Sequence, residues 1–195
     1  MQARDDAPLA LFERWFARAT RARIPLPEAM ALATADAKGR PSVRFVLLKQ
    51  VDGGGFVFFT DGGSRKGHEL RATPRAAAVF YWHPLGKQVR IEGAVEEVAP
   101  VEADEYWRTR PRASRLAALA STQSAALPSR RELLARWREL RVQYRGKPVP
   151  RPRRWTGFRI RPDVVEFWTR GANRLHTREC YRRRGKRWRR TLLQP

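Results

Sequence analysis

The feature that most constrains the fold is a series of short segments rich in aromatic and β-branched residues, separated by glycine-rich turns. Such segments favour β-strands because their side chains pack well on a pleated surface. The expected strands cover 29–35, 43–51, 56–60, 76–82, 88–98, 156–160, 164–168, 176–183 and 188–193. They do not alternate regularly with helices, which argues against a parallel sheet. We therefore expect a mainly β, α+β fold: an antiparallel β-barrel or sandwich with flanking helices.

Helices are expected at 8–23, 64–73, about 101–109 and 129–144. In the first, Leu9, Phe12 and Phe16 recur at spacings of three and four and form one apolar face. A chain of 195 residues with 42% hydrophobic residues can bury one core. We expect a single domain, 1–195, made of an N-terminal helix (1–27), the main strands (28–98), a helical segment (99–153) and C-terminal strands that complete the same sheet (154–195).

The charge is unusually positive, with 41 Lys and Arg against 19 Asp and Glu and a net charge of +22. Such a field attracts polyanions, although compositional bias on solvated faces accounts for most of it. No apolar run reaches the roughly 18 residues of a membrane span, and the N-terminus lacks the apolar stretch of a signal peptide. The single cysteine, Cys180, excludes an internal disulfide, and the three histidines have no metal-ligand spacing. We expect a cytoplasmic protein without a metal site.

Two segments in the first half carry candidate chemistry. Residues Arg44 to Lys49 form an expected strand with an apolar run between two cations. A glycine-rich turn at 61–63 opens a helix whose first residues are Ser64, Arg65 and Lys66. Free N–H groups and the helix dipole favour an anion there, and a bound phosphate would explain the cations. A strand with solvated charged ends is the simpler explanation of the first segment, and ordinary solvated charges are the alternative to a phosphate site in the second.

Two more segments lie in the second half. Tyr106 and Arg110 share a helical face, and Ser114 follows, so two hydroxyls and a guanidinium could embrace one phosphate. Arg174, His176 and Arg178 alternate along an expected strand and would face one way, where three basic groups repel unless an anion lies among them.

Read together, these segments resemble the pyridoxamine 5′-phosphate oxidase family over nearly the whole chain, from about Leu11 to the end. The resemblance rests on strings that include Leu11-Phe12-Glu13-Arg14-Trp15, Arg44 to Lys49, Ser64-Arg65-Lys66, Arg110-Pro111-Arg112-Ala113-Ser114, Gln123-Ser124, Glu166-Phe167-Trp168 and Arg174-Leu175-His176-Thr177-Arg178. It implies an antiparallel FMN-binding split barrel and a homodimer with FMN at the subunit interface.

The resemblance also implies the site residues. Those that fall where the family contacts FMN are Arg44, Phe45, Val46, Leu47, Leu48, Lys49, Phe59, Thr60, Arg65, Lys66, Gln88, Gln123, Ser124, Trp168 and Arg178. Those that fall where the family binds its phosphorylated B6 substrate are Lys49, Tyr106, Arg110, Ser114, Arg174, Leu175 and His176. Arg174 and His176 fall beside the substrate ring and are the expected catalytic pair.

The implied reaction oxidises pyridoxamine 5′-phosphate or pyridoxine 5′-phosphate to pyridoxal 5′-phosphate. A hydride passes from the substrate C4′ carbon to FMN, and dioxygen is reduced to hydrogen peroxide. The sequence departs from the family at both ends. About seven residues precede the first helix, so we expect the family's N-terminal lid to be missing. The chain ends Leu192-Leu193-Gln194-Pro195 where the family often has Arg-Leu-x-Pro.

Two alternatives stay open. One is a related split-barrel flavin oxidase that acts on another substrate, as in phenazine pathways; Tyr106, Arg110 and Ser114 favour a phosphorylated substrate instead. The other is a basic nucleic-acid-binding protein, supported by the net charge and the Arg-rich tail around Trp188. No RNA-binding motif is visible, so we expect nucleic acid to bind only non-specifically.

Overall fold

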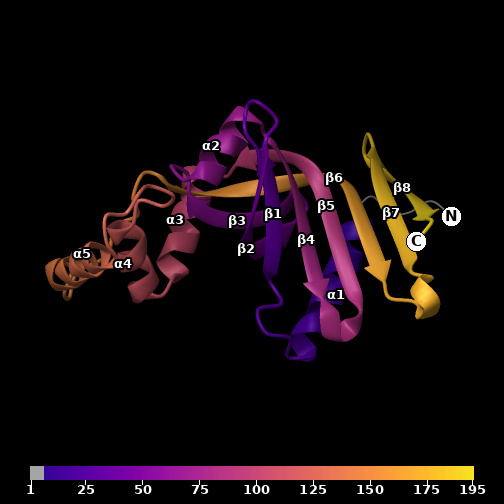
Figure 1. Ribbon diagram of the computed structural model, residues 1–195, viewed down its shortest axis with the longest axis horizontal. Helices are drawn as coiled ribbons and strands as arrows, with labels where there is room; N and C mark the ends of the chain where they lie inside the picture. Colours follow the sequence, from indigo (N-terminus) through magenta and orange to yellow (C-terminus); the bar gives the residue numbers. More distant parts are fainter. Residues whose placement is uncertain (1–6) are drawn as a thin grey trace.

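The computed structural model describes residues 7–195. Eight strands form one antiparallel sheet in the order β3-β2-β1-β4-β5-β6-β7-β8 (Figure 1). Their bounds are β1 Ala29–Ala35, β2 Pro41–Asp52, β3 Gly55–Asp61, β4 Arg75–Trp82, β5 Lys87–Glu97, β6 Trp155–Thr169, β7 Thr177–Arg184 and β8 Arg187–Leu193. An additional β3–β6 pairing closes the first six strands into a barrel, and β7 and β8 extend from β6. The expected antiparallel split barrel is therefore confirmed.

The helices lie around this barrel. They are α1 Ala7–Arg21, α2 Arg65–Ala72, α3 Pro100–Thr109, α4 Arg112–Ala120 and α5 Arg130–Gln143, with short 3-10 turns at η1 His83–Leu85 and η2 Ala172–Arg174. Helices α3, α4 and α5 gather at one end of the molecule, and the β7–β8 hairpin lies at the other (Figure 1). None of the helices within residues 7–195 is long and apolar enough to cross a membrane.

Strand β6 belongs both to the closed barrel and to the strands that extend from it. Its first residues, Trp155 to Ile160, pair with β3 and close the barrel, and Val164 to Thr169 pair with β7. Between these halves, the β5–β6 register shifts next to Gly93. A Cβ at Gly93 would lie 2.0 Å from the carbonyl oxygen of Arg161, so only glycine fits this close approach.

Two apolar cores hold the elements in place. The larger fills the barrel and includes α1, whose fully buried Phe12 packs against Phe56, Phe80 and Trp82. The smaller lies between the barrel wall and helices α3 and α4, around Trp155. It fixes these helices against β3 and β6, and so positions their polar side chains beside β2.

The structure corrects three details of the prediction. Helix α4 falls where no helix was expected, and the strands predicted at 156–160 and 164–168 are one continuous strand, β6. The expected alternation of Arg174, His176 and Arg178 along one strand is wrong, because β7 begins at Thr177. Asn173 and Arg174 have left-handed backbone, with φ of 51° and 63°, and so form a turn instead.

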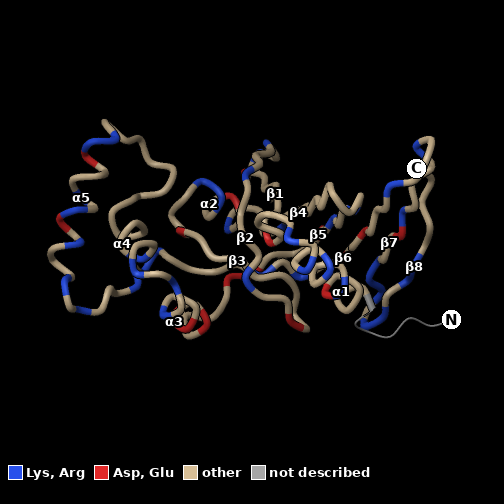
Figure 2. The backbone as a smooth tube through the Cα atoms, turned by 90° about the horizontal axis from the view of Figure 1, so that it is seen from below, with Lys and Arg blue, Asp and Glu red and all other residues tan. Residues whose placement is uncertain are grey.

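Basic residues occupy most elements, from α5 at one end to β7 and β8 at the other (Figure 2). Several are neutralised locally: Arg159 pairs with Asp52 and Glu102, and Arg71 pairs with Glu97. The positive charge is thus spread over the molecule and does not form a single stripe.

Candidate active site

A cavity of about 680 Å³ opens between β2, β3, the start of α2 and helices α3 and α4. It brings together most of the residues proposed from the first half of the chain and from the Tyr106 segment. The predicted site residues that line it are Arg44, Phe45, Val46, Leu47, Lys49, Phe59, Thr60, Lys66, Tyr106, Arg110, Ser114 and Gln123. We call these the cavity group.

Strand β2 supplies both cations of the first motif. The β2–β3 register shifts between Leu48 and Gln50, which leaves Lys49 as the extra residue of a β-bulge. On a regular strand, residues five apart point to opposite faces, but a bulge changes the direction of the side chains. Lys49 and Arg44 both line the cavity. The side chain of Leu48 points into the barrel core and is only 6% exposed.

The helix α2, which follows the glycine-rich turn, carries a buried cation, Lys66, in its first turn. Ser64 caps the helix by accepting a hydrogen bond from the Gly67 N–H, and donates its hydroxyl proton to the Asp61 carbonyl at 2.6 Å. The Lys66 ammonium donates to Gln123 Oε1 at 2.6 Å, to Thr60 Oγ1 at 3.0 Å and to Ser64 Oγ at 3.3 Å. All three acceptors are neutral oxygens, so this ammonium makes no direct ion pair within residues 7–195.

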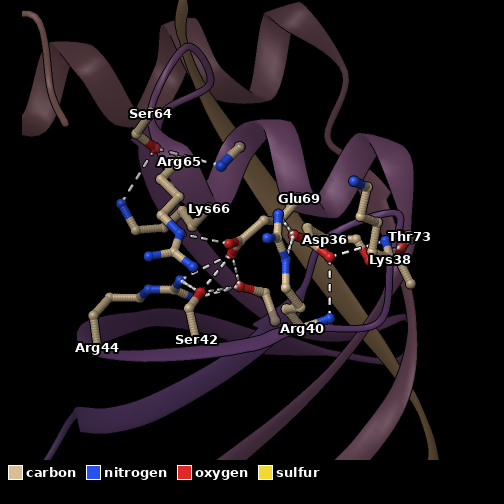
Figure 3. Close-up of polar contacts among 12 residues, drawn as sticks. Asp36, Lys38, Arg40, Ser42, Arg44, Ser64, Arg65, Lys66, Glu69 and Thr73 are labelled. Carbon is tan, nitrogen blue, oxygen red and sulfur yellow. Dashed lines mark hydrogen bonds and ion pairs between the residues drawn. The ribbon is translucent and has the colours of Figure 1, made fainter. Parts of the chain in front are cut away.

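Burial and neighbouring charge act on Lys66. Burial lowers the pKa of its ammonium to about 8, and the charge of Arg44 adds to this effect, whereas Asp61 and Glu69 partly offset it. A buried cation of this kind gains stability when an anion arrives. Arg65 differs from Lys66: its side chain is 63% exposed and pairs with Glu69 (Figure 3). Arg65 does not line the cavity.

The opposite wall of the cavity holds a second cation. The Arg110 guanidinium lies 4.8 Å from the Trp155 ring centroid and 5.5 Å from that of Trp107, distances that fit cation–π contacts. Its Nη2 donates to the Ser114 carbonyl at 3.3 Å, and its buried Nε has no hydrogen-bond partner in the described part of the chain. Burial lowers the pKa of Arg110. A buried donor without a partner, on a partly buried cation, is what an anionic ligand would satisfy.

Aromatic rings line the same cavity as the two cations. Tyr106 stacks on Phe59 with ring centroids 4.1 Å apart, and Phe59 stacks on Trp155 at 5.4 Å. Trp155 was not predicted as a site residue, because it follows a Pro-rich connector and belongs to no charged motif. Other cavity residues missed from the sequence are Asp61, Pro111, Ala117, Ala118 and Ser121.

The remaining predicted residues lie elsewhere. Gln88, Trp168 and Arg178 lie side by side on β5, β6 and β7 by register, and Trp168 contacts His176 with ring centroids 4.5 Å apart. Together with Arg174 and Leu175 they form what we call the β7 group. None of its members lines the cavity. Ser124, which follows Gln123 with a φ of 72°, does not line it either.

Two contacts order the β7 group. The Gly171 N–H donates to His176 Nδ1 at 3.2 Å, which leaves Nε2 as the protonated nitrogen of the neutral ring. Arg178 donates to both carboxylate oxygens of buried Glu166, at 2.8 and 3.1 Å, and this pair raises the pKa of Arg178. No cluster of three or more His, Cys, Asp or Glu side chains suited to a metal ion occurs between residues 7 and 195.

The chain matches two family models. Residues 16–144 match the model described as pyridoxamine 5′-phosphate oxidase, and residues 155–195 match the pyridoxine 5′-phosphate oxidase C-terminal dimerisation region. Curated relatives named pyridoxine/pyridoxamine 5′-phosphate oxidase include one from Rubrobacter xylanophilus, 51% identical over 98% of this chain and 88% of the relative. Another, from Myxococcus xanthus, is 50% identical over 96% of this chain and 91% of its own length.

Solved structures agree in fold. PhzG from Burkholderia lata, in complex with tetrahydrophenazine-1-carboxylic acid, superimposes with a TM-score of 0.93 and is 39% identical, covering 96% of this chain and 92% of its own. An FMN-binding protein from Nostoc punctiforme, related to pyridoxamine 5′-phosphate oxidase, has a TM-score of 0.74 at 17% identity, which supports the fold alone.

The barrel and its cation-lined cavity thus define a split-barrel flavin oxidoreductase. More specifically, the chain belongs to the pyridoxamine 5′-phosphate oxidase family. Its cofactor is FMN, and its C-terminal strands form the region through which the family dimerises. The Lys66 ammonium, which has no carboxylate partner among residues 7–195, and the orphaned Arg110 Nε fit two phosphate-bearing ligands, as a flavin mononucleotide and a phosphorylated substrate would require.

Proposed function

We propose that the cavity group of one subunit and the β7 group of its partner form one active site. The enzyme is an FMN-dependent oxidase that converts pyridoxamine 5′-phosphate or pyridoxine 5′-phosphate to pyridoxal 5′-phosphate, with dioxygen reduced to hydrogen peroxide. The observation that carries the site proposal is a cavity lined by the buried Lys66 and the partly buried Arg110, neither of which pairs with a carboxylate in the described chain.

Exposed apolar residues support a site that two subunits share. On β2, Val43 is 68% exposed, and Phe45, which lines the cavity, is 76% exposed. Leu175, within the β7 group, is 71% exposed. Apolar surfaces of this kind on a monomer mark interfaces. In a two-fold dimer each subunit offers both surfaces, so pairing β2 with the partner's β7 group builds two equivalent sites.

The cavity group, together with Arg65 and Ser124 next to it in sequence, would hold both phosphates. Lys66 and Arg65, at the start of α2, would bind the FMN phosphate, aided by Gln123, Ser124 and Arg44. Arg110, held on Trp155, would bind the substrate phosphate together with Lys49, Tyr106 and Ser114. Separate cations for the two phosphates keep the substrate ring and the flavin in a fixed relation, which raises the rate by positioning.

The β7 group would act on the reacting end of the substrate. FMN, when bound, supplies the two-electron acceptor that dioxygen later reoxidises. Arg174 would orient the substrate ring, and His176 would present Nε2–H, since its Nδ1 accepts the Gly171 N–H. With the amine substrate, the imine product takes up water and releases ammonia; with the alcohol, the aldehyde forms directly.

A test for the shared site uses two inactive variants. Arg110→Ala damages the cavity group and Arg174→Ala damages the β7 group, and we expect each homodimer to have low peroxide production while Arg174→Ala retains FMN. Refolding an equal mixture places both defects in the same site of each heterodimer and leaves the other site intact. Random pairing should then restore about a quarter of the wild-type activity.

The control mixture combines Arg110→Ala with Lys49→Ala, both from the cavity group. Every site in that mixture carries a defect, so activity should stay low. If the first mixture also stays inactive, each active site lies within one subunit and the proposal is wrong.

The likeness to PhzG favours a second candidate, an oxidase of a partly reduced phenazine carboxylic acid. The orphaned Arg110 Nε beside Tyr106 and Ser114 argues for a phosphate-bearing substrate instead. Peroxide assays with pyridoxine 5′-phosphate, with unphosphorylated pyridoxine and with a reduced phenazine carboxylate distinguish the two activities.

We also infer that nucleic acid binds this protein only through non-specific charge attraction. The basic residues are distributed over most elements, and several are paired with carboxylates (Figure 2). Affinity for duplex DNA or single-stranded RNA should therefore fall by roughly a thousandfold between 50 and 200 mM salt. Tight, sequence-selective binding at physiological salt would contradict this inference.

A further inference from the structure

We propose that Glu69, a buried carboxylate outside the cavity, is a positioning residue that sets Arg44 and Arg65 for the phosphate of FMN. This inference rests on the proposed function, which places the FMN phosphate at the start of α2. It adds a residue that touches neither ligand and belongs to none of the charged motifs of the sequence.

Glu69 lies in the second turn of α2, and its side chain is only 4% exposed. Its Oε1 accepts a hydrogen bond from Arg65 Nε at 2.7 Å. Its Oε2 accepts from Ser42 Oγ at 2.6 Å, from Thr34 Oγ1 at 2.5 Å and from Arg44 Nη2 at 3.1 Å. Figure 3 shows the guanidinium groups of Arg65 and Arg44 both directed toward the Glu69 carboxylate, with Ser42 beside it. Donors from β1, β2 and α2 thus converge on one carboxylate.

The two hydroxyls extend the hold on Arg44. Arg44 Nη1 donates to Thr34 Oγ1 at 2.6 Å, and Arg44 Nη2 donates to Ser42 Oγ. Each hydroxyl in turn donates its own proton to Glu69. The guanidinium of Arg44 is therefore fixed three times, once directly and twice through a hydroxyl. A planar, multiply bonded guanidinium has little freedom left to lose when an anion binds.

Glu69 also keeps cations together that would otherwise repel. Arg44, Arg65 and Lys66 converge near the first turn of α2, and the charge of Arg44 already acts on the Lys66 ammonium. Glu69 is the carboxylate that pairs with both arginines. Without it, mutual repulsion would turn the flexible arginine side chains toward solvent, away from the position that a phosphate needs.

Positioning and simple electrostatics predict opposite results. If only the local charge mattered, removing a carboxylate would make the site more positive and FMN would bind more tightly. If Glu69 positions the arginines, its loss should weaken binding despite the gain in positive charge. If Glu69 served the fold alone, its loss would lower thermal stability and leave the affinity of the folded protein unchanged.

The test compares FMN with riboflavin, which lacks the phosphate, by fluorescence titration of the apoprotein. For Glu69→Ala we expect the FMN dissociation constant to rise about tenfold or more, with riboflavin binding unchanged. Glu69→Gln retains one acceptor oxygen and should lie between the wild type and Glu69→Ala. It also serves as the folded variant if Glu69→Ala fails to fold.

The matched control is Glu97→Gln. Glu97 also pairs with an arginine of α2, Arg71, but that pair is exposed and lies outside the cavity. This variant should bind FMN like the wild type. Tighter or unchanged FMN binding by both Glu69 variants, or an equal loss for FMN and riboflavin, would overturn the inference. If the wild type itself shows no preference for FMN over riboflavin, the proposed phosphate site is wrong, and the role of Glu69 falls with it.

Discussion

At the scale of single residues, Lys66 is the most informative side chain. It is a buried ammonium with a pKa lowered to about 8, and it lies at the proposed site of the FMN phosphate. Only the protonated form attracts a phosphate. A bound dianion would in turn stabilise the proton, so the pKa of Lys66 should be higher in the complex than in the free protein. FMN binding is therefore coupled to the protonation of Lys66.

We predict that FMN affinity falls as the pH rises through about 8. Above that value the free protein has lost the Lys66 proton and must regain it to bind, so the dissociation constant should rise by about tenfold per pH unit until the pKa of the complex is reached. Flavin fluorescence titrations between pH 7 and 9.5 measure this slope.

Two variants serve as controls for the pH dependence. Lys66→Arg keeps a charge that does not titrate in this range, and should bind FMN with a nearly flat profile. Lys66→Met should bind weakly at every pH. A wild-type profile that matches that of Lys66→Arg would show that Lys66 does not cause the pH dependence, and would refute the assignment.

Several residues of the site could be predicted from the sequence because their signal is local. Arg44, Lys49, Lys66 and Arg110 each stand in a short pattern of cations beside a turn or an apolar run, and the structure gathers them around one cavity. Glu69 and Trp155 could not be found this way. The importance of Glu69 comes from Thr34 and Ser42, which are 35 and 27 residues away, and that of Trp155 from the guanidinium of Arg110.

At the scale of elements, the sequence predicted best where a periodic pattern is bounded by turns. The strands around the Gly53–Gly55 turn and helix α1 appear close to their expected bounds. The region of β6 was predicted as two strands, 156–160 and 164–168, and Pro162, which lacks an N–H group, lies between them. In the structure Pro162 pairs with Gly93 at a register shift, where a strand tolerates proline.

Two other errors of the prediction, at helix α4 and at the loop before β7, also have physical causes. Helix α4 is short, with only Leu116 and Ala120 buried, so its apolar pattern is too brief to stand out. Basic residues alternate in the sequence before β7 as they would along a strand, but in the structure this segment is a turn that begins at Gly171. A Cβ at Gly171 would lie 1.9 Å from the carbonyl oxygen of Leu175, and the Gly171 N–H fixes His176. The local periodicity of a sequence does not reveal contacts of this kind across a turn.

At the scale of the whole molecule, the proposed active site is divided between two surfaces of one chain. The cavity group lies toward the end with α3 and α4, and the β7 group lies on the strands toward the other end (Figure 1). A single chain does not bring these groups into one cavity. A homodimer in which the cavity group of one subunit faces the β7 group of the other would complete the site. The binding of FMN and the association of subunits would then be one coupled equilibrium.

The coupling gives a quantitative prediction. A ligand that binds the dimer but not the monomer stabilises the dimer by about 2.7 kcal/mol per site at a concentration one hundred times its dissociation constant. Two sites then contribute about 5.4 kcal/mol, which lowers the dimer dissociation constant by roughly ten thousandfold. Sedimentation of the apoprotein at nanomolar concentrations, with and without FMN, measures this shift.

Because each chain carries +22, the two experiments must share one ionic strength, since salt screens the repulsion between subunits. Arg178→Ala, which removes a proposed FMN contact on the partner's side, should shrink the FMN-dependent shift, whereas Glu97→Gln should leave it intact. An FMN-loaded monomer, or a dimer affinity that does not respond to FMN, would mean that one subunit binds the flavin by itself.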